Sequence, residues 1–244
     1  MSQTLEDRFV RFAKGLDGVE VIDDLDLTRE QQQAQKADFF FQGRTIIGEL
    51  KSLKTDTAGK VDVILEPYRD APEWPHFFGE VELHKVINAL PNKDELNRKI
   101  FSAVTDSIEG VMEKANRQIR TTKKTFDLPD AGGLLIILND LVDILSPDML
   151  VHRVGRCFGK KTAEGQVRFP EITVVWAINA AHYSQITPTL KGRPLLILPS
   201  SMPDPHNIAN FVETLGRKWA AFDGVPHFRT DAEGFRKQRF RTFS

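Results

Sequence analysis

Apolar residues recur every three or four positions in three stretches of the chain, which is the spacing of an amphipathic α-helix. The first stretch runs from Leu5 to Leu16, and the last spans residues 206–221. Residues 94–126 contain no proline and predict one long helix between them. Its expected buried stripe is Leu96, Ile100, Val104, Ile108, Val111 and Ala115.

Other stretches predict strands. Residues 133–139 are a dense apolar run, typical of a central strand that is buried on both faces. Further strands are predicted at residues 19–22, 172–178 and 195–198. Ser146 followed by proline predicts the cap and first turn of a helix that ends near Phe158. The mixture of helices and strands predicts an α/β fold.

Two runs rich in aromatic and β-branched residues, 37–41 and 45–53, predict a β-hairpin. Because side chains alternate along a strand, Glu49 and Lys51 point to the same side of the sheet. A four-residue turn would place Asp38 opposite Glu49, whereas a three-residue loop would offset the pair by one position.

Charged side chains in such an apolar setting are costly to bury unless something pairs with them, and a bound cation would supply that partner. Asp38 and Glu49 have the hard oxygen ligands that Mg²⁺ prefers, and Lys51 could act on an attacking water or offset charge on a phosphate. The alternative is a surface hairpin in which Glu49 and Lys51 are solvated and Asp38 caps a turn.

Asp38 and the tripeptide Glu49-Leu50-Lys51 resemble the PD-(D/E)xK, or restriction-endonuclease-like, nuclease superfamily. In that family an Asp begins one core strand and Glu-x-Lys lies near the end of the next. The chain departs from the family name at Ala37, where the family has proline. The resemblance implies a restriction-endonuclease-like core, with a central mixed β-sheet flanked by helices.

The resemblance also implies roles for individual residues. The catalytic set that it implies is Asp38, Glu49, Lys51, Glu6 and Gln118. The metal ligands, for Mg²⁺ or Mn²⁺, would be Asp38, Glu49 and the backbone carbonyl of Leu50. Glu6 would be an outer ligand on the first helix, and Gln118 would position the substrate strand from the long helix. The expected activity is metal-dependent nucleic-acid cleavage.

The last third of the long helix is basic, with no acid among residues 114–124. The set expected to bind nucleic acid, taken here as DNA, is Lys114, Arg117, Gln118, Arg120 and Lys124. The same cations, with Lys123, would also compensate the dipole at a helix C-terminus, so this alternative stays open. A second group of cations, Arg153, Arg156 and Lys160, follows in the helix after Ser146.

Composition narrows the class of protein. Lys and Arg number 33 against 34 acids, so affinity for nucleic acid must come from local patches. The single cysteine, Cys157, excludes an intramolecular disulfide. No apolar run approaches a membrane span, so we expect a soluble cytoplasmic protein without a membrane partner. No phosphate-binding glycine loop or nucleophilic-serine motif is present, which argues against an ATP-driven enzyme or an esterase.

We expect one nuclease-like domain over residues 1–226, with a proline-punctuated insertion at about 55–92. In the insertion, His76, Glu80, Glu82 and His84 follow no compact metal-ligand spacing. Residues 227–244 form a tail with five Arg or Lys, two acids and several phenylalanines. These phenylalanines would dock on the body or on a second subunit, which leaves a homodimer open.

The hypothesis is therefore a divalent-metal-dependent endonuclease that hydrolyses phosphodiester bonds in DNA. One alternative is a catalytically inactive protein of the same fold that acts as a nucleic-acid-binding or interaction module. A structural α/β protein with a chance motif is a third, and it predicts that Asp38, Glu49 and Lys51 do not converge.

Overall fold

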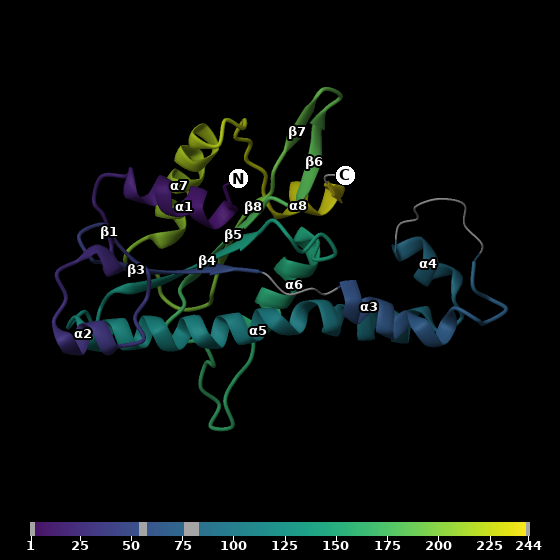
Figure 1. Cartoon of the computed structure of the whole chain (residues 1–244), viewed down its shortest axis with the longest axis horizontal. Helices are drawn as coiled ribbons and strands as arrows, with labels where there is room; N and C mark the ends of the chain where they lie inside the picture. Colours follow the sequence, from purple (N-terminus) through teal and green to yellow (C-terminus); the bar gives the residue numbers. More distant parts are fainter. Residues whose placement is uncertain (1–2, 54–57, 76–82, 243–244) are drawn as a thin grey trace.

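The structure, a computed structural model, describes residues 3–53, 58–75 and 83–242 (Figure 1). His76, Glu80 and Glu82 of the insertion lie outside these ranges, and the side chain of His84 is also not described. Within the described part of the chain, no helix has the length and apolar character needed to cross a membrane.

A six-stranded sheet of order β1-β2-β3-β4-β5-β8 forms the centre of the molecule. Its strands are β1 Val19–Val21, β2 Phe39–Phe41, β3 Ile46–Ser52, β4 Gly132–Asn139, β5 Val174–Asn179 and β8 Leu195–Pro199. The strands β3, β4 and β5 are parallel, and the other neighbours pair antiparallel. The predicted α/β fold with a central mixed sheet flanked by helices is confirmed.

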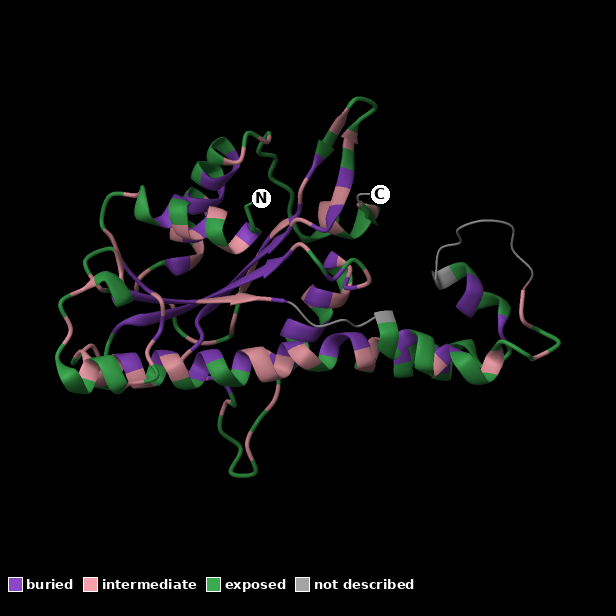
Figure 2. Ribbon diagram, viewed as in Figure 1, coloured by how far each residue is buried: buried purple, intermediate pink, exposed green. Residues whose placement is uncertain are grey.

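Helices cover both faces of this sheet (Figure 1). One face carries α1 Leu5–Lys14 and α7 Ile208–Phe222, and the other carries α5 Lys93–Thr125 and α6 Pro147–Phe158. All eight residues of β4 are buried, because Leu134, Ile136 and Leu138 pack toward α1 and α7 while Leu135 and Ile137 pack toward α5. Figure 2 shows the buried residues running through the centre of the sheet.

Local signals account for the ends of these helices. Thr4 and Asp7 form a capping box at the start of α1, in which each side chain bonds the other residue's backbone N–H. The Ser146 hydroxyl accepts from the Met149 N–H, so the predicted cap of α6 is confirmed. The long helix also agrees with the prediction over residues 94–126, since α5 begins at Lys93 and ends at Thr125.

The insertion packs on the N-terminal part of α5, which projects beyond the sheet (Figure 1). It contains α3 Ala58–Leu65, the 3-10 turn η2 Glu66–Tyr68 and α4 Leu83–Ala89. Both helices pack on α5, where Val61 and Ile87 join its apolar cluster. Residues 58–68 are therefore helical throughout.

The tail joins the body through a small second sheet. Its elements are α8 Ala232–Lys237 and β9 Phe240–Thr242, and β9 pairs with β6 His182–Thr187, which also pairs with β7 Leu190–Gly192. Phe235 packs against the core cluster beside α5 and contacts Phe240, with the two rings tilted and their centroids 5.2 Å apart. The remaining short elements are η1 Ile22–Asp24 and α2 Arg29–Gln33.

Candidate active site

The hairpin of β2 and β3 sets the position of the two predicted carboxylates. Phe39 pairs with Gly48 and Phe41 with Ile46, so the turn takes four residues, 42–45. The regular pairing ends at Phe39, and the Asp38 N–H still donates to the Gly48 carbonyl at 3.1 Å, so Asp38 stays bonded to β3. The four-residue alternative is therefore correct, and its register places Asp38 opposite Glu49.

Asp38, Glu49 and Lys51 share one side of the sheet. Alternation puts Asp38 in phase with Phe40 and Glu49 in phase with Ile47, and both of these apolar residues pack in the cluster beneath α5. Lys51 lies two residues beyond Glu49 on the same side, and its ammonium forms an ion pair with Glu49 Oε1. The three side chains therefore converge under the long helix.

Glu49 is fully buried, with 0% of its surface exposed. Neither of its carboxylate oxygens accepts a hydrogen bond of ordinary geometry from the described residues, although Lys51 neutralises part of its charge. Burial, reinforced by the charge of Asp38, raises the pKa of Glu49 to about 8. A buried carboxylate with one oxygen paired to Lys51 and a raised pKa fits a group that can take up a cation or a proton.

Asp38 is held by the opposite strand. Its Oδ2 accepts from the Leu50 N–H at 2.7 Å, and burial still raises the pKa of Asp38 despite this bond and the nearby Lys51. Because the N–H and C=O of one strand residue point to the same edge, the Leu50 carbonyl also faces the Asp38 side. The Asp38 carboxylate and the Leu50 carbonyl therefore lie on the same side of β3, and their role as metal ligands stays a prediction.

The oxygen atoms of this site suit Mg²⁺ or Mn²⁺. Two carboxylates and a backbone carbonyl are hard ligands, and Mg²⁺ uses few protein ligands because it keeps water or substrate oxygens in its other positions. Within the described ranges, no group of three or more His, Cys, Asp or Glu side chains is placed to hold a metal ion. A metal at this site would therefore depend on Asp38, Glu49 and the Leu50 carbonyl.

Glu6 belongs to the opposite face of the sheet. It lies in the first turn of α1, whose buried residues pack with Phe39, Phe41 and Ile46. The Leu5 N–H donates to Asp140 Oδ2 at 3.4 Å, so this turn lies beside the loop that follows β4. A role for Glu6 as an outer ligand stays a prediction.

Gln118 binds the chain that leads into Asp38. Its Nε2 donates to the Lys36 carbonyl at 3.1 Å. One turn further along α5, the Thr122 hydroxyl accepts from the Ala37 N–H at 2.7 Å. These two bonds fasten residues 36 and 37 to the long helix, and a substrate-positioning role for Gln118 stays a prediction.

A polar cleft of about 400 Å³ connects Asp38 with the basic part of α5. Its lining is Asp23, Ala34, Gln35, Lys36, Ala37, Asp38, Lys114, Arg117 and Gln118. Three of the predicted nucleic-acid-binding residues therefore lie beside the predicted catalytic Asp. The residues that the sequence reasoning missed are Lys36 and Asp23, although the position of Lys36 two residues before Asp38 was a usable signal.

The other predicted cations lie elsewhere. Arg120 and Lys123 both bind the carboxylate of Glu171, at 3.2 and 2.8 Å, and this pairing lowers the pKa of Glu171 against the effect of its burial. Lys124 is exposed and is not part of the cleft lining. A nucleic-acid contact by Arg120 or Lys124 stays a prediction, and for Arg120 it would compete with Glu171.

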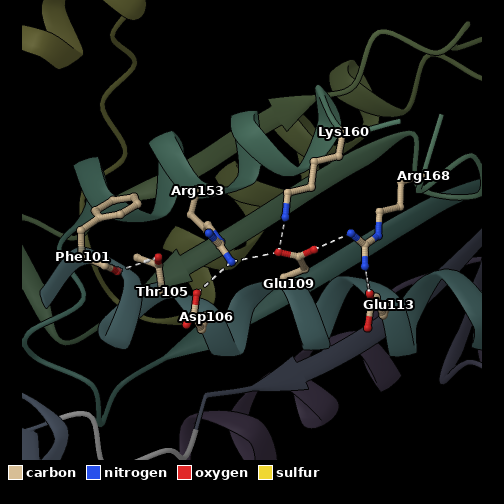
Figure 3. Close-up of polar contacts among 8 residues, drawn as sticks. All are labelled: Phe101, Thr105, Asp106, Glu109, Glu113, Arg153, Lys160 and Arg168. Carbon is tan, nitrogen blue, oxygen red and sulfur yellow. Dashed lines mark hydrogen bonds and ion pairs between the residues drawn. The ribbon is translucent and has the colours of Figure 1, made fainter. Parts of the chain in front are cut away.

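Two cations of the second basic group, Arg153 and Lys160, serve the fold, whereas Arg156 is exposed. Arg153 is only 8% exposed and donates to Asp106 and Glu109 of α5, and Lys160 also binds Glu109 (Figure 3). Arg168 joins the same carboxylate. These cations connect α6 and the loop after it to the long helix.

Comparison of the chain with models of protein families, with curated proteins and with solved structures gives no match.

Proposed function

We propose that the protein is a divalent-metal-dependent endonuclease with a restriction-endonuclease-like core, acting on DNA. The observation that carries the proposal is the convergence of Asp38, Glu49 and Lys51 on one side of the β2–β3 hairpin, next to a cleft lined by Lys114 and Arg117. A chance motif on an otherwise structural hairpin gives no reason to bury Glu49 fully beside the carboxylate of Asp38.

Asp38, Glu49 and the Leu50 carbonyl would hold Mg²⁺ or Mn²⁺. When bound, the ion would supply charge for the phosphate oxygens and lower the pKa of water. The Leu50 N–H orients the Asp38 carboxylate, and the chain around Asp38 is fixed to α5 by Gln118. Lys51, whose side chain is 25% exposed, would orient the attacking water and offset negative charge that develops on the phosphate.

The sheet supports the proposed core. An antiparallel hairpin that carries the acids is followed by the parallel strands β4 and β5, with a long helix over the acidic side. The family resemblance implies a central mixed sheet flanked by helices, and the mixed sheet of this chain supports the proposal.

A second candidate is a catalytically inactive module that binds nucleic acid or a partner protein. One observation favours it: the Lys51 ammonium already pairs with Glu49, so the charges of the site are partly satisfied within the protein. In that case the cleft would bind a strand without cutting it.

Cleavage assays separate the two candidates. The purified protein is incubated with duplex, single-stranded and branched DNA, and with RNA, in Mg²⁺, Mn²⁺ or chelator. We expect cutting only with metal. The cleavage rate should fall about a hundredfold or more in Asp38→Asn and in Glu49→Gln, because each change removes a ligand of the metal ion that stabilises charge on the phosphate. Glu30→Gln, an exposed acid on α2, should cut like the wild type. Absence of cutting under every condition, or full activity in Glu49→Gln, would refute the nuclease.

A further inference from the structure

The cleft beside Asp38 contains a cation that the proposed function has not used. The side chain of Lys36 is only 12% exposed, and its ammonium lies 2.9 Å from Asp23 Oδ1. Asp23 is 76% exposed, so this carboxylate is well solvated and can exchange its partner at low cost. The side chain of Lys36 is therefore held in the wall of the cleft, whereas its counter-ion Asp23 is free to move into solvent.

We propose that Lys36, Lys114 and Arg117 form a phosphate-binding seat for a single strand of nucleic acid, and that Asp23 is an internal counter-ion which a substrate phosphate displaces. The inference rests on the proposed function, because it identifies the cleft as the path by which a strand reaches Asp38. It adds the substrate class and two residues, Lys36 and Asp23, to that proposal.

The composition of the cleft favours phosphate as the recognised group. Three cations line it, against the two acids Asp23 and Asp38. None of the side chains that line it is aromatic, so bases find no stacking surface there. Contacts would fall on the sugar-phosphate backbone, which carries no sequence information, and binding should be independent of sequence.

The size of the cleft favours a single strand. Its volume of about 400 Å³ lies near the lower end of the range for small-molecule pockets, roughly 300–1,000 Å³. Such a space suits a nucleotide unit. Glu49 is fully buried and Asp38 lines the cleft, so a phosphate that approaches the acids enters through the cleft, which a flexible single strand can do more readily than a rigid duplex.

The seat is also rigid. Gln118 holds the Lys36 carbonyl and Thr122 holds the Ala37 N–H, so the backbone that carries Lys36 is bonded to the helix that carries Lys114 and Arg117. The two sides of the cleft are fixed relative to each other before a strand binds, which lowers the cost of ordering on binding.

Binding of a fluorescent single-stranded oligothymidylate, measured by anisotropy in chelator, tests the seat without cleavage. Lys36→Gln should weaken binding about three- to tenfold and lower the magnitude of the salt slope by roughly 0.7, the value for one single-strand phosphate contact. Lys36→Arg should restore both, because it keeps the charge. Asp23→Asn should tighten binding about two- to fivefold, because it removes the competing carboxylate. Lys218→Gln, an exposed cation on α7, is the matched control and should change neither affinity nor slope by as much.

A closed dumbbell duplex of the same length should bind at least about tenfold more weakly than the single strand. Equal binding of the two would overturn the assignment to a single strand. Wild-type affinity in Lys36→Gln, or no tightening in Asp23→Asn, would overturn the seat. Because these readouts need neither metal nor turnover, a protein that binds as expected but never cuts would refute the proposed nuclease and leave the seat standing.

Discussion

Glu49 is the residue at which proton and metal compete. Its pKa is raised to about 8, first by burial and then by the charge of Asp38, so near neutral pH the metal-free protein favours the protonated side chain. A metal ion needs the carboxylate, and binding should release a proton. The affinity for metal is therefore expected to rise with pH up to about 8.

The same shift makes stability depend on pH. A carboxyl whose pKa is higher in the folded protein contributes stability below its unfolded pKa of about 4.5, and that contribution is lost as the pH rises through about 8. At about 1.4 kcal/mol for each pKa unit, the metal-free protein should lose a few kcal/mol across this window. Urea denaturation of wild type and Glu49→Gln at pH 5, 7 and 9 measures the difference. Parallel pH profiles would show that Glu49 does not titrate in this window.

A substitution at Lys51 distinguishes an effect on cleavage from an effect on substrate binding. Lys51→Ala leaves both proposed ligands in place but removes the group assigned to the attacking water and to the developing charge. We expect cleavage to fall about a hundredfold or more. Affinity for substrate, measured with Ca²⁺ in place of Mg²⁺, should stay within about threefold of wild type. A variant that cuts normally would remove Lys51 from the mechanism.

At the scale of elements, the local sequence of the β2–β3 hairpin determines its register, and contacts with α5 determine its position. Thr122 links the two: its hydroxyl accepts from the Ala37 N–H and donates to the Gln118 carbonyl. Thr122→Val keeps the shape but leaves the Ala37 N–H buried without an acceptor, at a cost of about 1–3 kcal/mol. Thr122→Ser keeps the hydroxyl and should remain close to wild type in urea denaturation. Equal loss in both variants would point to packing of the methyl group and not to the hydrogen bond.

The contact between α5 and α6 depends on Glu109, whose carboxylate forms ion pairs with Arg153, Lys160 and Arg168 (Figure 3). Glu109→Gln leaves Arg153 nearly buried with Asp106 as its remaining acid, and we expect a loss of about 2–3 kcal/mol in the free energy of unfolding.

Glu113→Gln is the matched control for that change. Glu113 is a half-exposed residue of the same helix, α5, and pairs with Arg168 of the loop after α6, so its loss should cost less than about 1 kcal/mol. Thermal or urea denaturation of the two variants should show this difference. Similar losses in both would mean that burial of Arg153 does not determine the effect.

Elements defined by strong local patterns were predictable. The long helix over residues 94–126 and the central strand over 133–139 agree with α5 and β4, because their apolar periodicity spans many residues. The hairpin register was predictable only as one of two alternatives, since the turn length decides it and sequence left that length open. Convergence of Asp38 and Glu49 then followed from alternation.

Contacts between distant segments were not predictable. The strand β9 pairs with β6, and no local signal joins residues 240–242 to 182–184. The cations of α6 read as a basic stripe, because the sequence does not reveal that Arg153 turns toward Glu109. Lys36 was not predictable for the same reason, because the cleft that it lines is formed with residues of α5, about eighty residues away in the sequence.

For the whole molecule, a metal ion should act as a stabilising ligand. An ion that binds only the folded protein stabilises it by about 2.7 kcal/mol at a hundredfold excess over its Kd, so Mn²⁺ or Mg²⁺ should raise the Tm with concentration. The double variant Asp38→Asn with Glu49→Gln should abolish the rise, and Glu30→Gln should keep it. Because Glu49 holds a proton below about pH 8, the rise should be larger at pH 8.5 than at pH 6. An unchanged rise of Tm in the double variant would show that the ion binds elsewhere. If the rise vanishes in the double variant but is independent of pH in the wild type, the ion binds at this site without competition from a proton on Glu49.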